Sequence, residues 1–369
     1  MKPVYIRATG LYAEHCVDQQ QLAQHLATRP ALPAPALYQA ANVRLVKSEL
    51  AVIAREDRSI LNDLATGILN ATSDLLSQAA VRGLDAPEDM PLYAGTDGVA
   101  EYSFTALSQL IEKLGTPQAT LQNLGQLSGM TNPINMMRFL STNPVYHLSK
   151  RLALRGGGYP IRGMSLSGLY ALEDAVAELQ AGRSQQALVC AAGSMRNFDS
   201  LVVFGKLGLL DPENPAANLH PSYGTALLWL DSTRSDDALA ELQWVQSCYS
   251  PEPFPQRHDW LQLLEQAAKR VTPDVVVSYC NGVKANDENE TSVIQALFPA
   301  AQICNYKSLF GYTSKANNLL DIVAMLADPS IKPGSTVLVN GAGFGVGIGY
   351  VVVKKLRHSP VHSTTGDAA

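Results

Sequence analysis

Two distant segments of the chain share one pattern, an apolar strand that runs into a turn of small residues. The first is ALVCAAGSM at residues 187–195, and the second is VLVNGAGFG at residues 337–345. Each directly follows a stretch with helical spacing of apolar residues, at 168–181 and 315–326. This pair is evidence for a duplicated unit. Alternating helices and buried strands favour a layered α/β architecture.

Composition excludes several classes of protein. The 369 residues are 46% hydrophobic and 17% charged, which rules out a disordered chain. Such a low charged share also suggests that a large core or a partner covers much of the surface. The net charge of -5, without a basic run, argues against nucleic-acid binding. No apolar run approaches 18 residues, so we expect no membrane span.

The cysteines and the N-terminus bear on the compartment. The five cysteines lie far apart and lack metal-ligand spacing, which predicts reduced thiols and no metal site. The first ten residues, MKPVYIRATG, have no signal-peptide pattern. We therefore expect a cytoplasmic protein, and nothing in the sequence indicates a cofactor.

A serine-rich turn at 163–168 is the first candidate site. The sequence GMSLSG places Ser165 between a predicted strand and a predicted helix. A nucleophile at a helix N-terminus gains from the helix dipole and from free backbone N–H groups that can hold an oxyanion. The alternative is an ordinary helix start, in which Ser167 caps the helix and Ser165 only fills the turn.

This region resembles the nucleophile region of the β-ketoacyl synthases. GMSLSG precedes an Ala- and Leu-rich helix and AGRSQQALVCAAG, where the family has A-C-x-[ST]-G and A-G-x-x-D-x-x-[LV]-x-G-G. Five further segments resemble family motifs in the same order. They are NMMRFLSTNP (135–144), VFGKLGLL (203–210), CNGVKANDENE (280–290), KSLFGYTSKANNLLD (307–321) and NGAGFGVG (340–347).

The resemblance covers residues 1 to about 355 and implies a fold. The family has a thiolase-like α/β fold, with two βαβαβ halves in a five-layer αβαβα sandwich. The implied halves are 1–232 and 233–357, followed by a flexible tail at 358–369.

The chain departs from the family at the catalytic positions. Condensing enzymes use one cysteine, which takes the acyl chain as a thioester, and two histidines. Ser165, Asn281 and Tyr312 stand at these positions. A serine hydroxyl is a poor nucleophile without a base, and neither an amide nor a phenol is an ordinary base near neutral pH. Asn281 and Tyr312 retain the ability to donate hydrogen bonds to an oxyanion.

Other positions keep the family's residue type or its approximate place. Lys307, Asp287, Glu290 and Asp321 are expected to form a structural network, because a buried lysine near carboxylates is more often a structural pair than a catalyst. The resemblance places the remaining candidates at the acyl tunnel or the dimer interface. They are Met136, Met137, Arg138, Phe139, Phe204 and Phe344.

Three functions remain open. The first is a non-catalytic chain-length factor that pairs with an active ketosynthase, receives an acyl carrier protein and helps to shape the acyl tunnel. The serine and the short chain resemble the chain-length factors of bacterial aryl polyene pathways. The second is a serine-dependent acyltransferase or hydrolase that uses Ser165, with a base supplied by folding. The third is a homodimeric scaffold that binds acyl carrier protein without chemistry.

Overall fold

The computed structural model describes residues 2–33, 43–96, 137–138, 140–196, 198–211 and 213–359. The sequence also predicts a helix at 103–114, ended by Gly115, and a loop at 121–133, which is rich in Gly, Gln, Asn and Ser; both lie outside these residues. Nearly all of the predicted tail at 358–369 also lies outside them.

The described strands form one ten-stranded sheet, in the order β3-β2-β4-β5-β1-β6-β10-β9-β7-β8. Its two halves repeat each other. Read from the centre outward, each half presents its first, fifth, fourth, second and third strand, and the fifth is antiparallel to both neighbours. The strands are β1 (Val4–Ala13), β2 (Leu92–Gly95), β3 (Gly158–Ile161), β4 (Gln186–Ser194), β5 (Tyr223–Asp231), β6 (Ala240–Cys248), β7 (Val275–Val277), β8 (Gln302–Cys304), β9 (Thr336–Gly343) and β10 (Gly347–Lys355). The duplication predicted from sequence is confirmed.

The two halves meet through hydrogen bonds. Strands β1 and β6 are antiparallel, with Val4, Tyr5 and Ile6 opposite Leu242, Glu241 and Ala240. The strands of the two halves therefore form one continuous sheet. The physical reason is that the first strand of each half lies at its inner edge, where unpaired backbone groups would otherwise be buried. The predicted boundary at 232 falls between β5 and β6, and the division into two domains stays a prediction.

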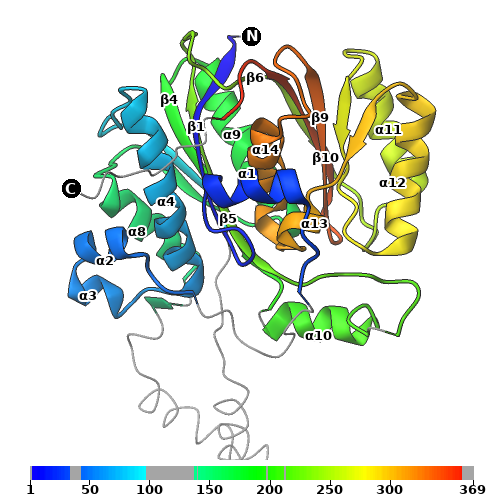
Figure 1. Ribbon diagram of the computed structural model, residues 1–369, viewed down its shortest axis with the longest axis horizontal. Helices are drawn as coiled ribbons and strands as arrows, with labels where there is room; N and C mark the ends of the chain where they lie inside the picture. Colours follow the sequence, from blue (N-terminus) through cyan, green and yellow to red (C-terminus); the bar gives the residue numbers. More distant parts are fainter. Residues whose placement is uncertain are drawn as a thin grey trace, which may run out of the picture.

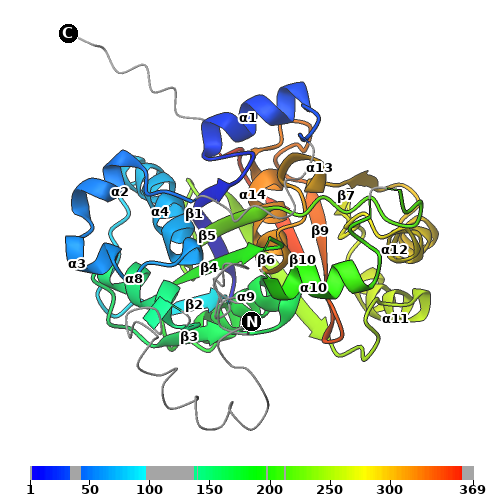
Figure 2. The ribbon, with the colours of Figure 1, turned by 90° about the horizontal axis from the view of Figure 1, so that it is seen from below.

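The helices complete five layers. Figure 1 shows α4 (Asp63–Val81) and α8 (Asn143–Arg151) on one side, and α11 (Arg257–Ala268) and α12 (Lys284–Leu297) on the other. Between them lie α9 (Ser167–Gln180) and α14 (Asn317–Ala327), which contact strands of both halves. Figure 2 shows the same separation of the outer helices from below. Every residue of α14 is buried, as expected of a helix that is covered on all sides.

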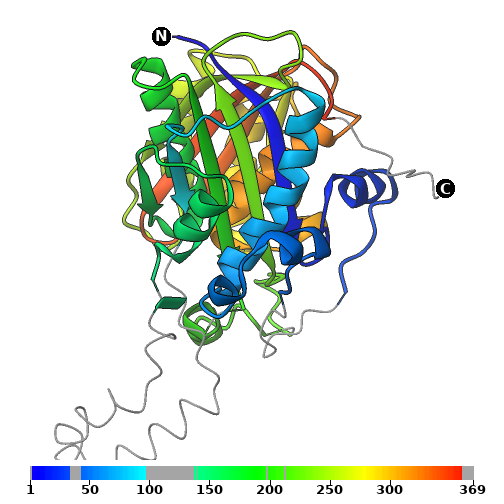
Figure 3. The ribbon, with the colours of Figure 1, turned by 90° about the vertical axis from the view of Figure 1, so that its left-hand side faces the viewer.

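Shorter elements surround this core. They are α1 (Gln19–Thr28), α2 (Lys47–Val52), α3 (Arg55–Arg58), α10 (Phe198–Lys206), α13 (Lys307–Phe310) and the 3₁₀ turns η1 (Met164–Leu166) and η2 (Ser314–Ala316). Figure 3 shows α4 lying along the strands of the N-terminal half. All five cysteines are free thiols. No helix among the described residues is both long enough and apolar enough to cross a membrane.

A buried lysine on β10 caps the C-terminus of the central helix α14. The Lys355 ammonium group donates to the carbonyl oxygens of Met325 at 2.9 Å and Asp328 at 2.8 Å. These carbonyls belong to the last turn of the helix, where the chain offers no intrahelical donor. The Asp328 carboxylate lies in the same cluster, where it accepts hydrogen bonds from Tyr306 at 2.9 Å and Arg29 at 3.0 Å. Lys355 thus ties the end of β10 to the central layer.

We predict that Lys355→Met destabilises the fold. Without Lys355 the buried Met325 carbonyl loses its donor, whereas the Asp328 carbonyl keeps the Ile331 amide at 3.3 Å, so the free energy of unfolding falls by about 1–3 kcal/mol. Lys354→Met is the matched control because Lys354 is the exposed neighbour on β10, and it should shift stability by less than about 0.5 kcal/mol. Urea denaturation of both variants measures the difference. Equal stabilities would contradict the capping role.

The same lysine predicts a pH dependence. Burial lowers the pKa of Lys355 to about 8, whereas an unfolded lysine titrates at about 10.4. Between these values the unfolded chain binds more protons than the folded one. The stability of the wild type relative to Lys355→Met should therefore rise as the pH rises from about 8 to about 10. Denaturation curves recorded at the two pH values measure this change.

Candidate functional site

Ser165 lies on a strained turn at the start of α9. It is the central residue of the 3₁₀ turn η1, and Met164 before it has a φ of 49°. A positive φ is uncommon for a residue other than glycine and marks a backbone held by its surroundings. Ser165 itself is only 2% exposed. The predicted placement between a strand and a helix N-terminus is therefore present.

Ser167 does not cap α9, although an ordinary helix start would have placed it at the cap position. It is the first residue of the helix, and its hydroxyl accepts from the Gly163 amide at 2.9 Å and donates to the Met164 carbonyl at 2.7 Å. Both bonds close the turn around Ser165. The neighbouring strand approaches closely at Gly95, where an added Cβ would lie 2.5 Å from the Ser167 carbonyl carbon. Packing and these two bonds fix the turn.

Folding brings the three predicted catalytic positions together. The Ser165 hydroxyl makes a very short contact with the Tyr312 hydroxyl, which lies 2.7 Å from the Tyr279 hydroxyl. The Asn281 side-chain amide donates to the Tyr279 hydroxyl at 3.4 Å. All four side chains are buried. We call this set (Ser165, Tyr312, Tyr279 and Asn281) the hydroxyl network.

The electrostatics of the hydroxyl network are those of neutral groups. Burial raises the pKa of Tyr312, and the hydrogen bonds from Ser165 and Tyr279 only partly oppose this rise. Burial also raises the pKa of Tyr279 well above its ordinary value. Both phenols therefore stay protonated near neutral pH, and neither takes a proton from Ser165 as a general base.

Sequence reasoning missed Tyr279, although a signal for it existed. The residue lies two positions after the end of β7, and Asn281 comes two positions later. Side chains two apart in an extended segment point to the same side, so a predicted role for Asn281 implies that Tyr279 lies beside it.

Two carboxylates hold the chain around Asn281. Asp287 accepts from the backbone amides of Asn281 at 2.9 Å and Gly282 at 3.0 Å. Glu290 accepts from the amides of Tyr279 and Cys280, both at 2.8 Å. Burial raises the pKa of Asp287 to about 6, against the effect of its backbone donors. These two residues of α12 set the position of the network's backbone.

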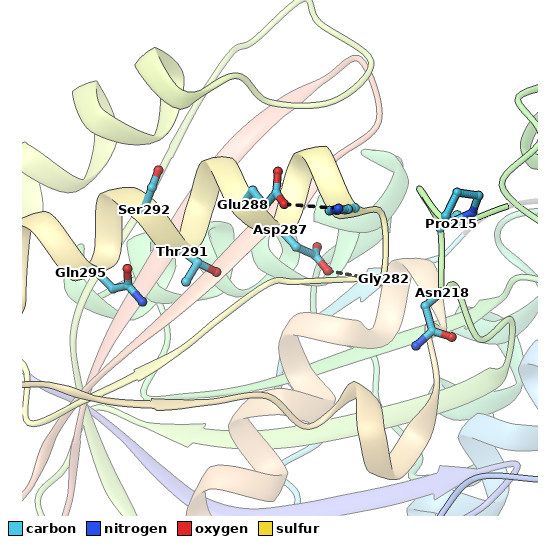
Figure 4. A pocket seen from close by; sticks show the side chains of 10 residues that line it. Pro215, Asn218, Gly282, Asp287, Glu288, Thr291, Ser292 and Gln295 are labelled. Atoms are coloured by element: carbon cyan, nitrogen blue, oxygen red, sulfur yellow. Dashed lines mark hydrogen bonds and ion pairs between the residues drawn. The ribbon is translucent and has the colours of Figure 1, made fainter.

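Asp287 also faces a surface cavity. Figure 4 shows the cavity between the start of α12 and the loop that carries Pro215 and Asn218. Its volume is about 640 Å³, and neutral polar side chains such as Thr291, Ser292 and Gln295 line its wall. Ser165 and Tyr312 do not line it.

Lys307 and Asp321 form a buried pair beneath the network. The ammonium group lies 2.5 Å from the Asp321 carboxylate and donates to the Ser278 carbonyl at 3.0 Å. It also lies 5.5 Å from the centre of the Tyr279 ring. Burial raises the pKa of Asp321 to about 6, although the Lys307 charge opposes the rise. The geometry is that of an anchor for the Ser278–Tyr279 backbone.

The predicted tunnel residues separate into two groups. Phe204 lies 6.3 Å from Tyr312 and 6.0 Å from Phe344 between ring centres, so both phenylalanines adjoin the network. Met137 is half-exposed, and the Arg138 guanidinium donates to the Ser59 carbonyl at 3.1 Å. Met136 and Phe139 lie outside the described residues. The tunnel role of these residues stays a prediction.

Metal ions have no evident place in this site. In the part of the chain that the structure describes, no three His, Cys, Asp or Glu side chains lie close enough to hold one.

Comparisons with known proteins come from structure alone. No family model matches the sequence, and no curated protein matches it. A type II polyketide synthase ketosynthase in complex with its acyl-carrier protein has a TM-score of 0.73 at 12% identity, over 96% of this chain and 99% of that one. A β-ketoacyl synthase from Burkholderia phymatum has a TM-score of 0.73 at 16% identity, over 97% and 100%. The ishigamide ketosynthase/chain length factor has a TM-score of 0.73 at 14% identity, over 96% and 99%.

The chain has the thiolase-like ketosynthase fold. At these identities the similarity shows the fold alone, and it agrees with the thiolase-like α/β fold predicted from the sequence.

We predict that Lys307 and Asp321 stabilise the fold only as a pair. Lys307→Met or Asp321→Leu alone leaves one buried charge without its partner, which costs about 3–5 kcal/mol. The double variant removes both charges and should cost clearly less than the sum of the two single changes. Chemical denaturation of the three variants forms a double-mutant cycle. Additive losses would show that the two charges do not depend on each other.

Proposed function

We propose that this chain is a non-catalytic ketosynthase-like subunit, a chain-length factor that pairs with an active β-ketoacyl synthase. One observation carries the proposal: the partner of the Ser165 hydroxyl is the Tyr312 phenol, which burial keeps protonated. A serine without a base is a weak nucleophile. The partner then supplies the condensation chemistry, and this subunit helps to shape the acyl tunnel.

The described side chains around Ser165 supply no replacement for the missing groups. The hydroxyl network contains no imidazole and no thiol. The nearest thiol in sequence to Asn281, Cys280, contacts the Glu290 carboxylate, and burial raises its pKa. Such a thiol is not ionised near neutral pH and is inert as a nucleophile.

An open sheet edge favours a protein partner. Strand β3 is the outermost strand of the N-terminal half and pairs only with β2 among the described strands. Tyr159 on this strand is 51% exposed, and Met164 just beyond it is 45% exposed. Exposed strand edges tend to pair with another chain. We propose that the ketosynthase covers this edge, with an interface of about 2,000 Å² or more.

We extend this proposal to the second partner and to the type of chain-length factor. The comparison structures include a ketosynthase/chain length factor and a ketosynthase in complex with its acyl-carrier protein. They support an acyl carrier protein as the second partner. The serine at position 165 favours the aryl polyene type of chain-length factor, acting in the cytoplasm. Met137 and Arg138, with the segment that contains them, are the proposed contributors to the end of the partner's acyl tunnel.

We predict a stable heterodimer on co-expression with the cognate ketosynthase. A tagged form of this chain should retain the ketosynthase through affinity purification and gel filtration. Tyr159→Lys, which puts a charge on the exposed β3 edge, should weaken the complex at least tenfold. Ile303→Lys is the matched control, because Ile303 is 39% exposed on β8, at the opposite edge of the sheet. A chain that stays monomeric beside its ketosynthase would contradict the proposal.

We also predict that Ser165→Ala leaves condensation by the heterodimer within a few-fold of the wild-type rate. Removal of a true nucleophile costs about 10⁶ in rate in well-studied triad enzymes. The measurement is product formation from acyl carrier protein substrates, with the purified complex in both forms.

The second candidate, a serine acyltransferase or hydrolase, has the strained turn at Met164 in its favour. It requires that wild-type Ser165 gains mass after exposure to acyl thioesters and that Ser165→Ala abolishes the reaction. Intact-mass spectrometry on the chain alone therefore separates the two functions.

A further inference from the structure

The turn at Ser165 keeps the geometry of a nucleophile site although its base is missing. Met164 holds a φ of 49°, and Ser165 precedes the first turn of the 14-residue helix α9. A helix N-terminus favours negative charge and offers free backbone N–H groups. A strained turn of this kind persists only where its surroundings impose it. What distinguishes this site is therefore the group opposite the serine.

That group, Tyr312, is held in place on every side. Its hydroxyl lies between those of Ser165 and Tyr279, and its ring packs beside Phe204. Its backbone amide donates to the His220 carbonyl at 2.7 Å, and its carbonyl accepts from the Ser222 amide at 3.0 Å. The residue is only 2% exposed. A side chain with both its hydroxyl and its backbone fixed cannot swing aside without breaking several hydrogen bonds.

A row of aromatic rings connects Tyr312 with partly exposed residues. Phe204 touches Phe344, and Phe344 meets Phe254 at 5.4 Å between ring centres. Phe344 and Phe254 are both partly exposed. Met164, next to the serine, is nearly half-exposed. Ser165 thus lies directly beneath the surface, behind side-chain rings.

We propose that Tyr312 is a plug that silences a latent acyl-accepting serine, and that the ligand class of the unplugged site is an activated acyl ester or thioester. The plug acts in two ways, because the ring occupies the approach to Ser165 and the phenol occupies the place of a base. The inference concerns the same site as the proposed function. Its test uses this chain alone, so pairing with a ketosynthase and silencing by Tyr312 can fail separately.

The step expected after unplugging is an ordinary acyl transfer. The Ser165 hydroxyl oxygen attacks the acyl carbonyl carbon, an O–C bond forms and the C–S bond of the thioester breaks. The hydroxyl proton passes to a base at position 312 and from it to the departing thiolate, which leaves as a thiol. An imidazole at position 312 supplies that base, since its ordinary pKa is near the working pH.

The experiment compares five forms of the full chain. Wild type, Tyr312→Phe, Tyr312→His, Tyr312→Asn and Tyr312→His/Ser165→Ala are exposed to an alkyl fluorophosphonate and, separately, to the hexanoyl thioester of N-acetylcysteamine. Tyr312→Phe is the matched control because it removes the hydroxyl but keeps the ring. Intact mass and peptide mapping report the adduct, and thermal unfolding reports whether each form is folded. Tyr312→Asn is a second opened variant.

Tyr312→His is expected to be labelled at Ser165 about 100-fold faster than wild type, within the range that a positioned base contributes. Wild type and Tyr312→Phe stay unlabelled, and the Ser165→Ala change removes the adduct. Labelling of wild-type Ser165 at a comparable rate would overturn the proposal. So would a folded Tyr312→His form that remains unlabelled. Failure of both opened variants to fold would also overturn it, because the latent site must exist without the ring.

Discussion

The antiparallel pairing of β1 with β6 is the constraint on which the site depends. It joins two copies of the same five-stranded arrangement at their inner edges and makes the halves one sheet. The helices α9 and α14 are equivalent in the two copies, and both are enclosed between the halves. The 3₁₀ turns that precede them, η1 and η2, contact each other. Ser165 of the first half therefore meets Tyr312 of the second.

Burial then decides what chemistry this meeting point can perform. A serine and two tyrosines are neutral, so they can be buried together provided that their hydroxyls bond to one another. Ser165, Tyr312 and Tyr279 satisfy this condition. The same burial raises the pKa of both phenols and prevents them from acting as bases. The interactions that make the network stable also make it unreactive.

Much of the fold and of the site could be predicted from the sequence, because the spacing of apolar residues indicates which positions are buried. The repeated strand-and-turn segments at 187–195 and 337–345 became β4 and β9, which occupy equivalent places in the two halves. The convergence of Ser165, Asn281 and Tyr312 followed from ordered motifs. The position of Tyr279 beside Asn281 could have been predicted, because side chains two residues apart in an extended segment lie on the same side. A tyrosine near the end of a strand, however, has the same sequence pattern as an ordinary core residue.

Other features depend on tertiary contacts that no local pattern encodes. The role of Ser167 is an example, since a serine at a helix start has the same sequence signature whether it caps or closes the preceding turn. Its hydroxyl serves Gly163 and Met164 because η1 intervenes before α9. The joining of the two sheets is another example, since three residue pairs between β1 and β6 leave no mark on either strand's composition.

The charged residues around the network complete the physical account. Asp287 and Glu290 bind four consecutive backbone amides from Tyr279 to Gly282, and Lys307 binds the carbonyl of Ser278 just before them. Five consecutive residues thus have their backbones fixed by charged side chains, while the side chains that face Ser165 are neutral. The charged side chains therefore position the backbone of the site and do not face Ser165. Because the reactive face carries none, the framework of a catalytic centre and the absence of a base coexist in one fold.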